Sequence, residues 1–219
     1  MKFLREIKTA AVLLSLTTTP LTSFGAEKNY QVVPNADGTS GIQFSIGYSL
    51  GTHEGTATEI TGSLSLQDSP FLISTAAFTV PLNKVNTGNA KRDCHLLEAM
   101  GLDYSVSDYP NQHICNGNNE LPLSGKNAVA FNEIKFTLTT LLSGPGKATA
   151  IGVWEMHGVK KQIEIPLTLT VVEGSPAKLK VKTDFDLSLN DFGIIVKKVL
   201  FVTVKDTAHV SMELTLQEK

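Results

Sequence analysis

Apolar and polar residues alternate with a period of two along most of the chain. Four segments show this clearly and four more loosely: 42–50, 162–171, 179–187 and 209–216, then 56–66, 71–80, 131–141 and 148–156. Successive side chains of an extended strand point to opposite faces, so each segment has one apolar and one polar face. The pattern therefore predicts about eight β-strands.

The segments between these strands are short and rich in Gly, Pro, Asn and Ser, which favours turns. They are residues 35–38, 143–147, 157–160 and 173–177. Short links can join only antiparallel neighbours, so we expect hairpins. A sheet with one apolar face must cover that face, as a sandwich or as a closed barrel. The expected fold class is therefore all-β and antiparallel.

One stretch breaks the alternation and predicts a short α-helix over residues 89–101. Thr87 or Asn89 can cap its start, and Gly101 can end it. Its apolar residues have helical spacing: Ala90, Cys94, Leu97 and Met100, with Leu96 beside them. Polar residues take the opposite side: Lys91, Arg92, His95 and Glu98. Cys94 should therefore lie on the buried face of the helix.

The first 25 residues have the pattern of a secretory signal peptide. Three basic residues are followed by the apolar run 10–16, which is too short to span a bilayer, and then by small residues. Cleavage after Gly25 would place Ser23 and Gly25 at the two small-residue positions. We expect residues 26–219 to form one exported domain.

The charge of the chain excludes some partners. Removing the leader takes away three basic residues and one acidic residue, which changes the net charge from −2 to about −4. No basic stripe remains, which argues against nucleic acid as a partner. No second apolar span is present, so we do not expect the mature chain to span a membrane.

The two cysteines are expected to pair. Export would place Cys94 and Cys115 in an oxidising compartment, where two lone cysteines usually form a disulfide. The loop between them has about 20 residues, and closing it is worth roughly 3 kcal/mol by chain entropy. The alternatives are two free thiols, or a metal or redox site built from Cys94, His95, His113 and Cys115. Adjacent helical residues point about 100° apart, which argues against convergence of Cys94 and His95.

Catalytic patterns are weak, and we do not expect an enzyme. Asp93, His95 and Ser105 offer the residue types of a triad, but Ser105 does not lie in a nucleophile elbow of the pattern GxSxG. The phosphate-binding pattern GxGxxG is missing from the sequence. The acidic residues on polar strand faces are more simply solubilising charges.

Four motifs together resemble the YceI-like family of exported bacterial proteins. They are VNTGNAKRDCHL (85–96), DYP (108–110), MHGVKKQIEIPLTL (156–169) and NDFGI (190–194). The resemblance covers roughly residues 30–216. It implies an extended, lipocalin-like antiparallel β-barrel with a short helix, which holds an isoprenoid chain or a similar apolar molecule. The chain departs from the family pattern at Gly47, Tyr48, Glu54 and Leu189, so the resemblance leaves the identity of the ligand open.

The expected function is a periplasmic or secreted carrier of an apolar molecule, and a polyisoprenoid is the ligand that the resemblance implies. No cofactor is expected besides such a ligand, and a homodimer is left open. The strand residues named below could fill a core or line a cavity, and the resemblance favours the cavity. The expected ligand contacts, including the helix residues of a lid, are Phe44, Ile46, Phe78, Leu96, Leu97, Met100, Phe136, Trp154, Ile165, Leu167 and Phe185.

Two other functions remain open at this point. One is a metal or redox accessory protein that uses the Cys/His group named above. The other is an interaction module with a filled core, whose partner surface is the expected loop 116–128.

Overall fold

The structure is a computed structural model that describes residues 26–38, 41–68, 71–106, 129–144, 147–195 and 203–219. The expected leader (1–25), the expected loop (116–128), His113 and Cys115 lie outside the described residues. The helical elements are η1 (Leu82–Lys84), α1 (Ala90–Ala99) and η2 (Asn190–Phe192). The strands are β1 (Glu27–Val33), β2 (Ile42–Tyr48), β3 (Gly51–Ala57), β4 (Thr61–Asp68), β5 (Phe71–Pro81), β6 (Val85–Asn86), β7 (Glu133–Gly144), β8 (Lys147–Met156), β9 (Val159–Val172), β10 (Lys178–Ser188) and β11 (Val204–Glu218).

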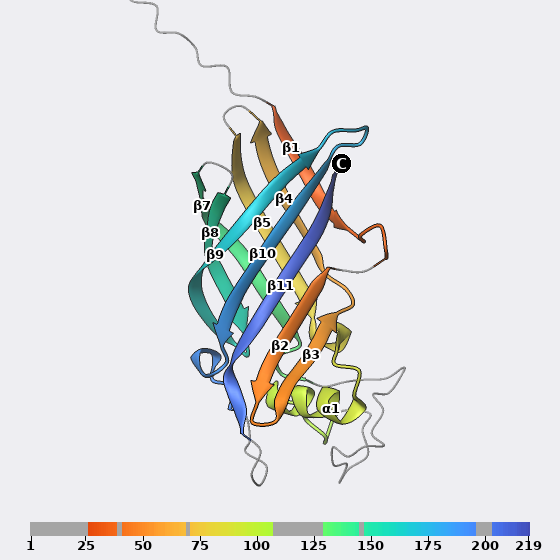
Figure 1. Cartoon of the computed structure of the whole chain (residues 1–219), viewed down its shortest axis with the longest axis vertical. Coiled ribbons are helices and arrows are strands. Elements are labelled where there is room, and N and C mark those ends of the chain that lie inside the picture. Colours follow the sequence, from red (N-terminus) through yellow and green to blue (C-terminus); the bar gives the residue numbers. More distant parts are fainter. Residues whose placement is uncertain (1–25, 39–40, 69–70, 107–128, 145–146, 196–202) are drawn as a thin grey trace, which may run out of the picture.

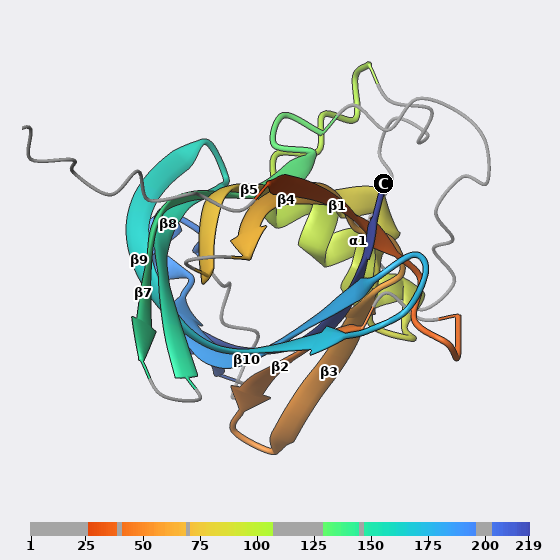
Figure 2. The same ribbon diagram turned by 90° about the horizontal axis from the view of Figure 1, so that it is seen from above.

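Eight of the strands close into an antiparallel barrel (Figures 1 and 2). Their order is β1-β4-β5-β7-β8-β9-β10-β11, and pairing between β1 and β11 completes the ring. The hairpin β2–β3 and the short β6 continue the sheet from β11, outside this ring. The all-β antiparallel barrel with one short α-helix is therefore confirmed.

The strand prediction needs two corrections. Residues 56–66 were expected to form one strand, but they hold only the end of β3, which begins at Gly51, and the start of β4 at Thr61, so most of β3 was not predicted. The strand β1 was not predicted, because charged and amide residues outnumber the apolar side chains Tyr30, Val32 and Val33 in it. The expected turns at 35–38, 157–160 and 173–177 do separate strands. At the second of these turns, His157 and Gly158 both have positive φ, as a tight hairpin requires.

One edge of β11 pairs with two strands, β1 and β2, which lie one after the other along it. Its C-terminal part pairs with β1, from Thr215↔Val33 to Glu218↔Tyr30, and its earlier part pairs with β2. The chain passes from β1 to β2 at Gly41, whose φ is 72°. A Cβ there would lie 1.9 Å from the carbonyl oxygen of Glu213, so only glycine fits this corner. The sheet thus divides at β11 into the closed ring and the β2–β3 hairpin.

A second division lies between β9 and β10. Their pairing ends at Thr183↔Leu167, and the next residue of β9, Pro166, has no N–H to donate. The hydroxyl of Thr183 donates a hydrogen bond to the Pro166 carbonyl oxygen. Beyond this point η2 packs against the two strands, with Phe192 1% exposed and its carbonyl oxygen 2.9 Å from His157 Nδ1. The region 188–204, whose conformation the alternation did not define, contains this turn.

The helix α1 lies across one end of the barrel, beside the β2–β3 hairpin (Figures 1 and 2). Asn89 caps it by accepting a hydrogen bond from the backbone N–H of Arg92 (3.1 Å). Cys94, Leu97 and Met100 are 1–3% exposed, so the predicted buried face is confirmed. Backbone hydrogen bonds from Ala130 and Phe131 to the carbonyl oxygens of Gly101 and Met100 fix its C-terminal end.

Three phenylalanine rings on the inner side of the sheet lie across glycines of the neighbouring strand. A Cβ built on Gly55 would lie 2.3 Å from the ring of Phe44. The same is true of Gly62 with Phe78 (2.4 Å) and of Gly152 with Phe136 (2.5 Å). In each case the two residues are cross-strand or near neighbours. The rings therefore pack along the wall of the sheet, where glycine leaves them room.

We predict that Gly152→Ala destabilises the barrel. The new methyl group would lie 2.5 Å from both the Phe136 ring and the Thr137 carbonyl oxygen, so backbone must move. Overpacking of this kind costs about 1–3 kcal/mol of the free energy of unfolding. Urea unfolding measures this cost. Gly174→Ala is the control, because its methyl group would meet only the Pro176 carbonyl oxygen at 3.4 Å. Equal stability of the two variants would contradict the packing described here.

Candidate functional site

The predicted strand residues share the inner face of the sheet. Phe78, Phe136 and Trp154 are cross-strand neighbours in one row over β5, β7 and β8. On the other side, Phe44 and Phe185 both lie opposite Val210 of β11. The strand residues expected as ligand contacts belong to the core or pack against it: Phe44, Ile46, Phe78, Phe136, Trp154, Ile165, Leu167 and Phe185. The structure thus brings them together on one continuous apolar face.

These side chains differ in exposure. Ile165 and Trp154 are buried, at 3% and 8% exposed. Phe44, Ile46, Phe78, Phe136, Leu167 and Phe185 are only half-buried. Half-buried phenylalanine and leucine on an inner face leave apolar surface that an apolar molecule could cover.

The lid residues of α1 divide into two kinds. Leu97 and Met100 are 2% and 3% exposed and belong to the hydrophobic core, whereas Leu96 is half-buried and packs against that core. Leu97 and Met100 therefore anchor the helix, and Leu96 is the more accessible of the three. Whether any of these residues touches a ligand stays a prediction.

Small residues on the inner face were missed by the sequence reasoning. Ala148, Ala150 and Gly152 alternate along β8 with half-buried residues and are themselves buried. Ala150 lies opposite Ile165, and Ala148 opposite Leu167. Together with the glycines under the phenylalanine rings, they reduce the side-chain volume inside the barrel. The sequence ATAIG already held this alternation of small residues.

Polar groups are few among the described inner-face residues. Thr183 is 4% exposed and bonded to Pro166, as described above. Lys161, opposite Trp154 in β9, forms an ion pair with Asp191 of η2 at 3.0 Å. The indole Nε1 of Trp154 has no hydrogen-bond partner within the described ranges. The inner face thus suits an uncharged, largely apolar molecule.

Arg92 connects α1 to the β2–β3 hairpin, although the helical pattern had placed it on the solvent side. Its Nη2 donates to the Thr87 carbonyl oxygen (2.7 Å), and its Nη1 lies 3.4 Å from His53 Nδ1. His53 stacks on Tyr48, with ring centroids 4.2 Å apart. Burial, and then the positive charge of Arg92, lower the pKa of His53 below its usual value. A long arginine side chain can lie along the surface toward such partners, which helical spacing alone does not show.

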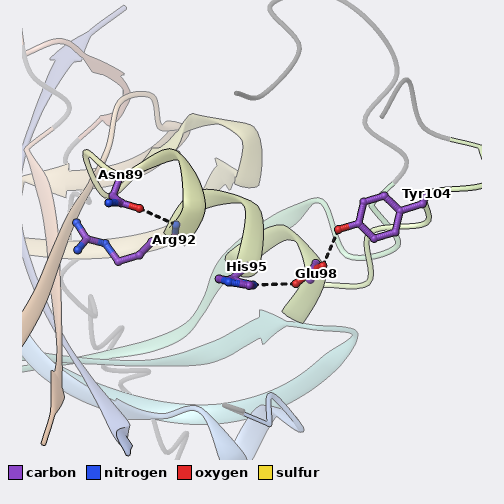
Figure 3. A network of polar contacts seen from close by, with 5 residues as sticks. All are labelled: Asn89, Arg92, His95, Glu98 and Tyr104. Carbon is purple, nitrogen blue, oxygen red and sulfur yellow. Dashed lines mark hydrogen bonds and ion pairs between the residues drawn. The ribbon is translucent and has the colours of Figure 1, made fainter. Parts of the chain in front are cut away.

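Other polar side chains of α1 hold the segment that follows the helix (Figure 3). Glu98 Oε2 lies 2.9 Å from His95 Nδ1, and the Tyr104 hydroxyl donates to Glu98 Oε1 at 2.6 Å. His95 is thereby on the exposed side, whereas Cys94 is buried. The two therefore point apart. Within the described residues no cluster of His, Cys, Asp and Glu is suited to a metal ion, and the other two members of the expected group lie outside them.

The residues of the imagined triad have other partners. Asp93 accepts hydrogen bonds from the hydroxyl and the backbone N–H of Thr87. Ser105 donates its hydroxyl hydrogen bond to Asp103, which lowers the pKa of that carboxyl group. With His95 bound to Glu98, the three side chains of the triad do not form a relay.

A groove of about 560 Å³ on the outer face is polar. Its lining includes the polar residues Gln43, Ser45, Glu54, Thr56, His209 and Ser211, and also Phe44, one of the expected ligand contacts. His209 Nδ1 lies 2.8 Å from Asp186. These groups suit water better than an apolar ligand, so the inner face remains the candidate site. No α-helix in the described parts of the chain has the length and hydropathy that crossing a membrane requires.

Solved structures with the same fold share little sequence with the chain. BcnA from Burkholderia cenocepacia aligns with a TM-score of 0.57 and 10% identity, over 80% of this chain and 95% of that one. The Campylobacter jejuni YceI protein aligns with a TM-score of 0.56 and 15% identity, over 76% of this chain and 85% of that one. The third structure is a polyisoprenoid binding domain from Saccharophagus degradans, which is implicated in plant cell wall breakdown. It aligns with a TM-score of 0.53 and 11% identity, over 87% of this chain and 98% of that one.

A search among curated proteins finds no match. The similarity to the solved structures, at these identities, shows the fold alone. The sequence itself, however, matches the model of the YceI-like domain over residues 30–116 and 124–216, which is most of the chain. The barrel with its single α-helix agrees with that match, and the chain therefore belongs to the YceI-like domain family.

Proposed function

We propose that this chain is a carrier that binds an apolar molecule, most simply a polyisoprenoid, inside the barrel. The observation that carries the proposal is the continuous apolar inner face, on which six of the predicted contact residues are only half-buried: four in strands of the ring, and Phe44 and Ile46 in the adjoining β2. A structural neighbour is described as a polyisoprenoid binding domain, which supports the same ligand class.

The burial of apolar surface alone can supply the free energy of such binding, so no catalytic group is required. Burial of each methylene-sized group releases about 0.8 kcal/mol, so a few isoprene units already give substantial affinity. The small side chains of β8 and the glycines beneath the phenylalanine rings reduce the side-chain volume that competes with such a guest. The half-buried Leu96 of α1 would cover the part of the ligand nearest the helix.

The carrier would act outside the cytoplasm, in the periplasm or after secretion. The leader pattern in residues 1–25 supports this location. The Cys94–Cys115 disulfide would then hold α1 against the end of the barrel, because Cys94 lies on the buried side of that helix.

We predict that Leu167→Asp reduces the affinity for an isoprenoid probe such as farnesol at least about tenfold. A carboxylate on the inner face would have to lose its hydration when the probe binds. Quenching of the fluorescence of Trp154, the single tryptophan of the chain, measures binding. Thr168→Asp is the matched control, since Thr168 is exposed and adjacent in β9. Equal affinity of the two variants, both verified as folded by circular dichroism, would argue against binding inside the barrel.

We predict that Cys115→Ser lowers the melting temperature of the oxidised protein. Removing a disulfide that closes a loop of about 20 residues lowers the free energy of unfolding by roughly 3 kcal/mol. This variant leaves the buried Cys94 in place, so it tests the bridge without changing the helix face. A reducing agent should lower the melting temperature of the wild type to that of the variant and should leave the variant unchanged. Identical melting of both oxidised proteins would exclude a stabilising disulfide.

A further inference from the structure

Among the residues that the structure describes, the indole N–H of Trp154 has no acceptor, and aromatic rings pack against it. Trp154 is 8% exposed, and its Nε1 atom is buried without an acceptor among the described residues. Buried indole N–H groups usually find a hydrogen-bond partner, because an unmade bond loses the hydration of the donor without replacement. A phenylalanine would fill the same apolar position without this loss. The donor therefore calls for a physical explanation.

The neighbours of Trp154 on the inner face cannot supply a strong acceptor. Phe136 and Phe185 contact the indole, with ring centroids 6.3 Å and 5.6 Å away. Lys161, directly opposite in β9, is a donor only and is paired with Asp191. Met156, two residues along the same strand face, offers only a thioether. The described neighbours of Trp154 therefore leave Nε1 without an acceptor.

The site of this donor is the inner face that we propose to bind ligand. Trp154 lies in the row of Phe78 and Phe136, and its contact with Phe185 connects this row to β10. Phe136 and Phe185 are half-buried, so each has accessible surface beside the indole.

We propose that Nε1–H of Trp154 donates a hydrogen bond to an oxygen atom of the ligand. This inference rests on the proposed function and narrows the ligand class: an isoprenoid chain that carries a neutral carbonyl, ether or hydroxyl oxygen. A neutral oxygen is favoured over a phosphate or carboxylate, because a charged group placed between the rings of Phe136 and Phe185 would lose its hydration. Trp154 would then determine specificity as well as contribute apolar surface.

A matched pair of probes tests the hydrogen bond. One is farnesylacetone, an isoprenoid ketone, and the other is its methylidene analogue, in which C=CH2 replaces C=O. Trp154→Phe removes the donor and keeps an aromatic ring. Titration calorimetry should show that this substitution lowers the ratio of ketone affinity to hydrocarbon affinity about tenfold, the value of one well-made hydrogen bond.

A second measurement uses the wild-type protein alone. Because the chain has one tryptophan, its ¹H–¹⁵N spectrum contains a single indole cross-peak. Binding of the ketone should move that proton downfield more than binding of the methylidene analogue does.

The outcomes separate this inference from the proposed function. If both probes bind the wild type and give the same indole shift, or if their affinity ratio is the same in Trp154→Phe, the hydrogen bond is refuted and the carrier function stands. If neither probe binds the wild type, both proposals are refuted. Should Trp154→Phe fail to fold, the indole shift in the wild type still decides.

Discussion

The pairing of β1 with β11 is the constraint on which the rest of this structure depends. It closes eight strands into a ring, so that one face of every strand must point inward. The period-two alternation of the sequence then becomes a division between an apolar interior and a polar exterior. Since β11 is long enough to pair with β1 and β2 in succession, the same strand also carries the hairpin that lies beside α1.

The space inside the barrel depends on the positions of its large and small side chains. Glycines beneath Phe44, Phe78 and Phe136 let these rings pack along the wall, and the alternating small residues of β8 add little volume. At the division between β9 and β10, Pro166 ends the pairing and η2 covers the strands. These features are compatible with an apolar guest, and the indole N–H of Trp154 is the donor that we propose for a polar atom on that guest.

The sequence predicted what alternation and helical spacing control directly. Long alternating segments such as 162–171 and 179–187 correspond to β9 and β10, and the buried face of α1 was correct at Cys94 and Leu97. The rest depended on contacts between distant segments. The strand β1 is defined by its two partners rather than by its own apolar residues, and the turn at residues 58–60 has no Gly or Pro to mark it. Arg92 was assigned to solvent because spacing does not show that His53 and Thr87 lie beside it. Predicting that Phe78, Phe136 and Trp154 lie in one row would have required the register of three strands.

The most direct measurement is native mass spectrometry of the mature protein purified after export in bacteria. The account predicts a population carrying one additional mass that organic solvent releases and that fragments as an isoprenoid-type molecule. Repeated preparations that contain only the bare polypeptide, although isoprenoids were available to it, would contradict the claim that the inner face of the barrel holds an apolar ligand.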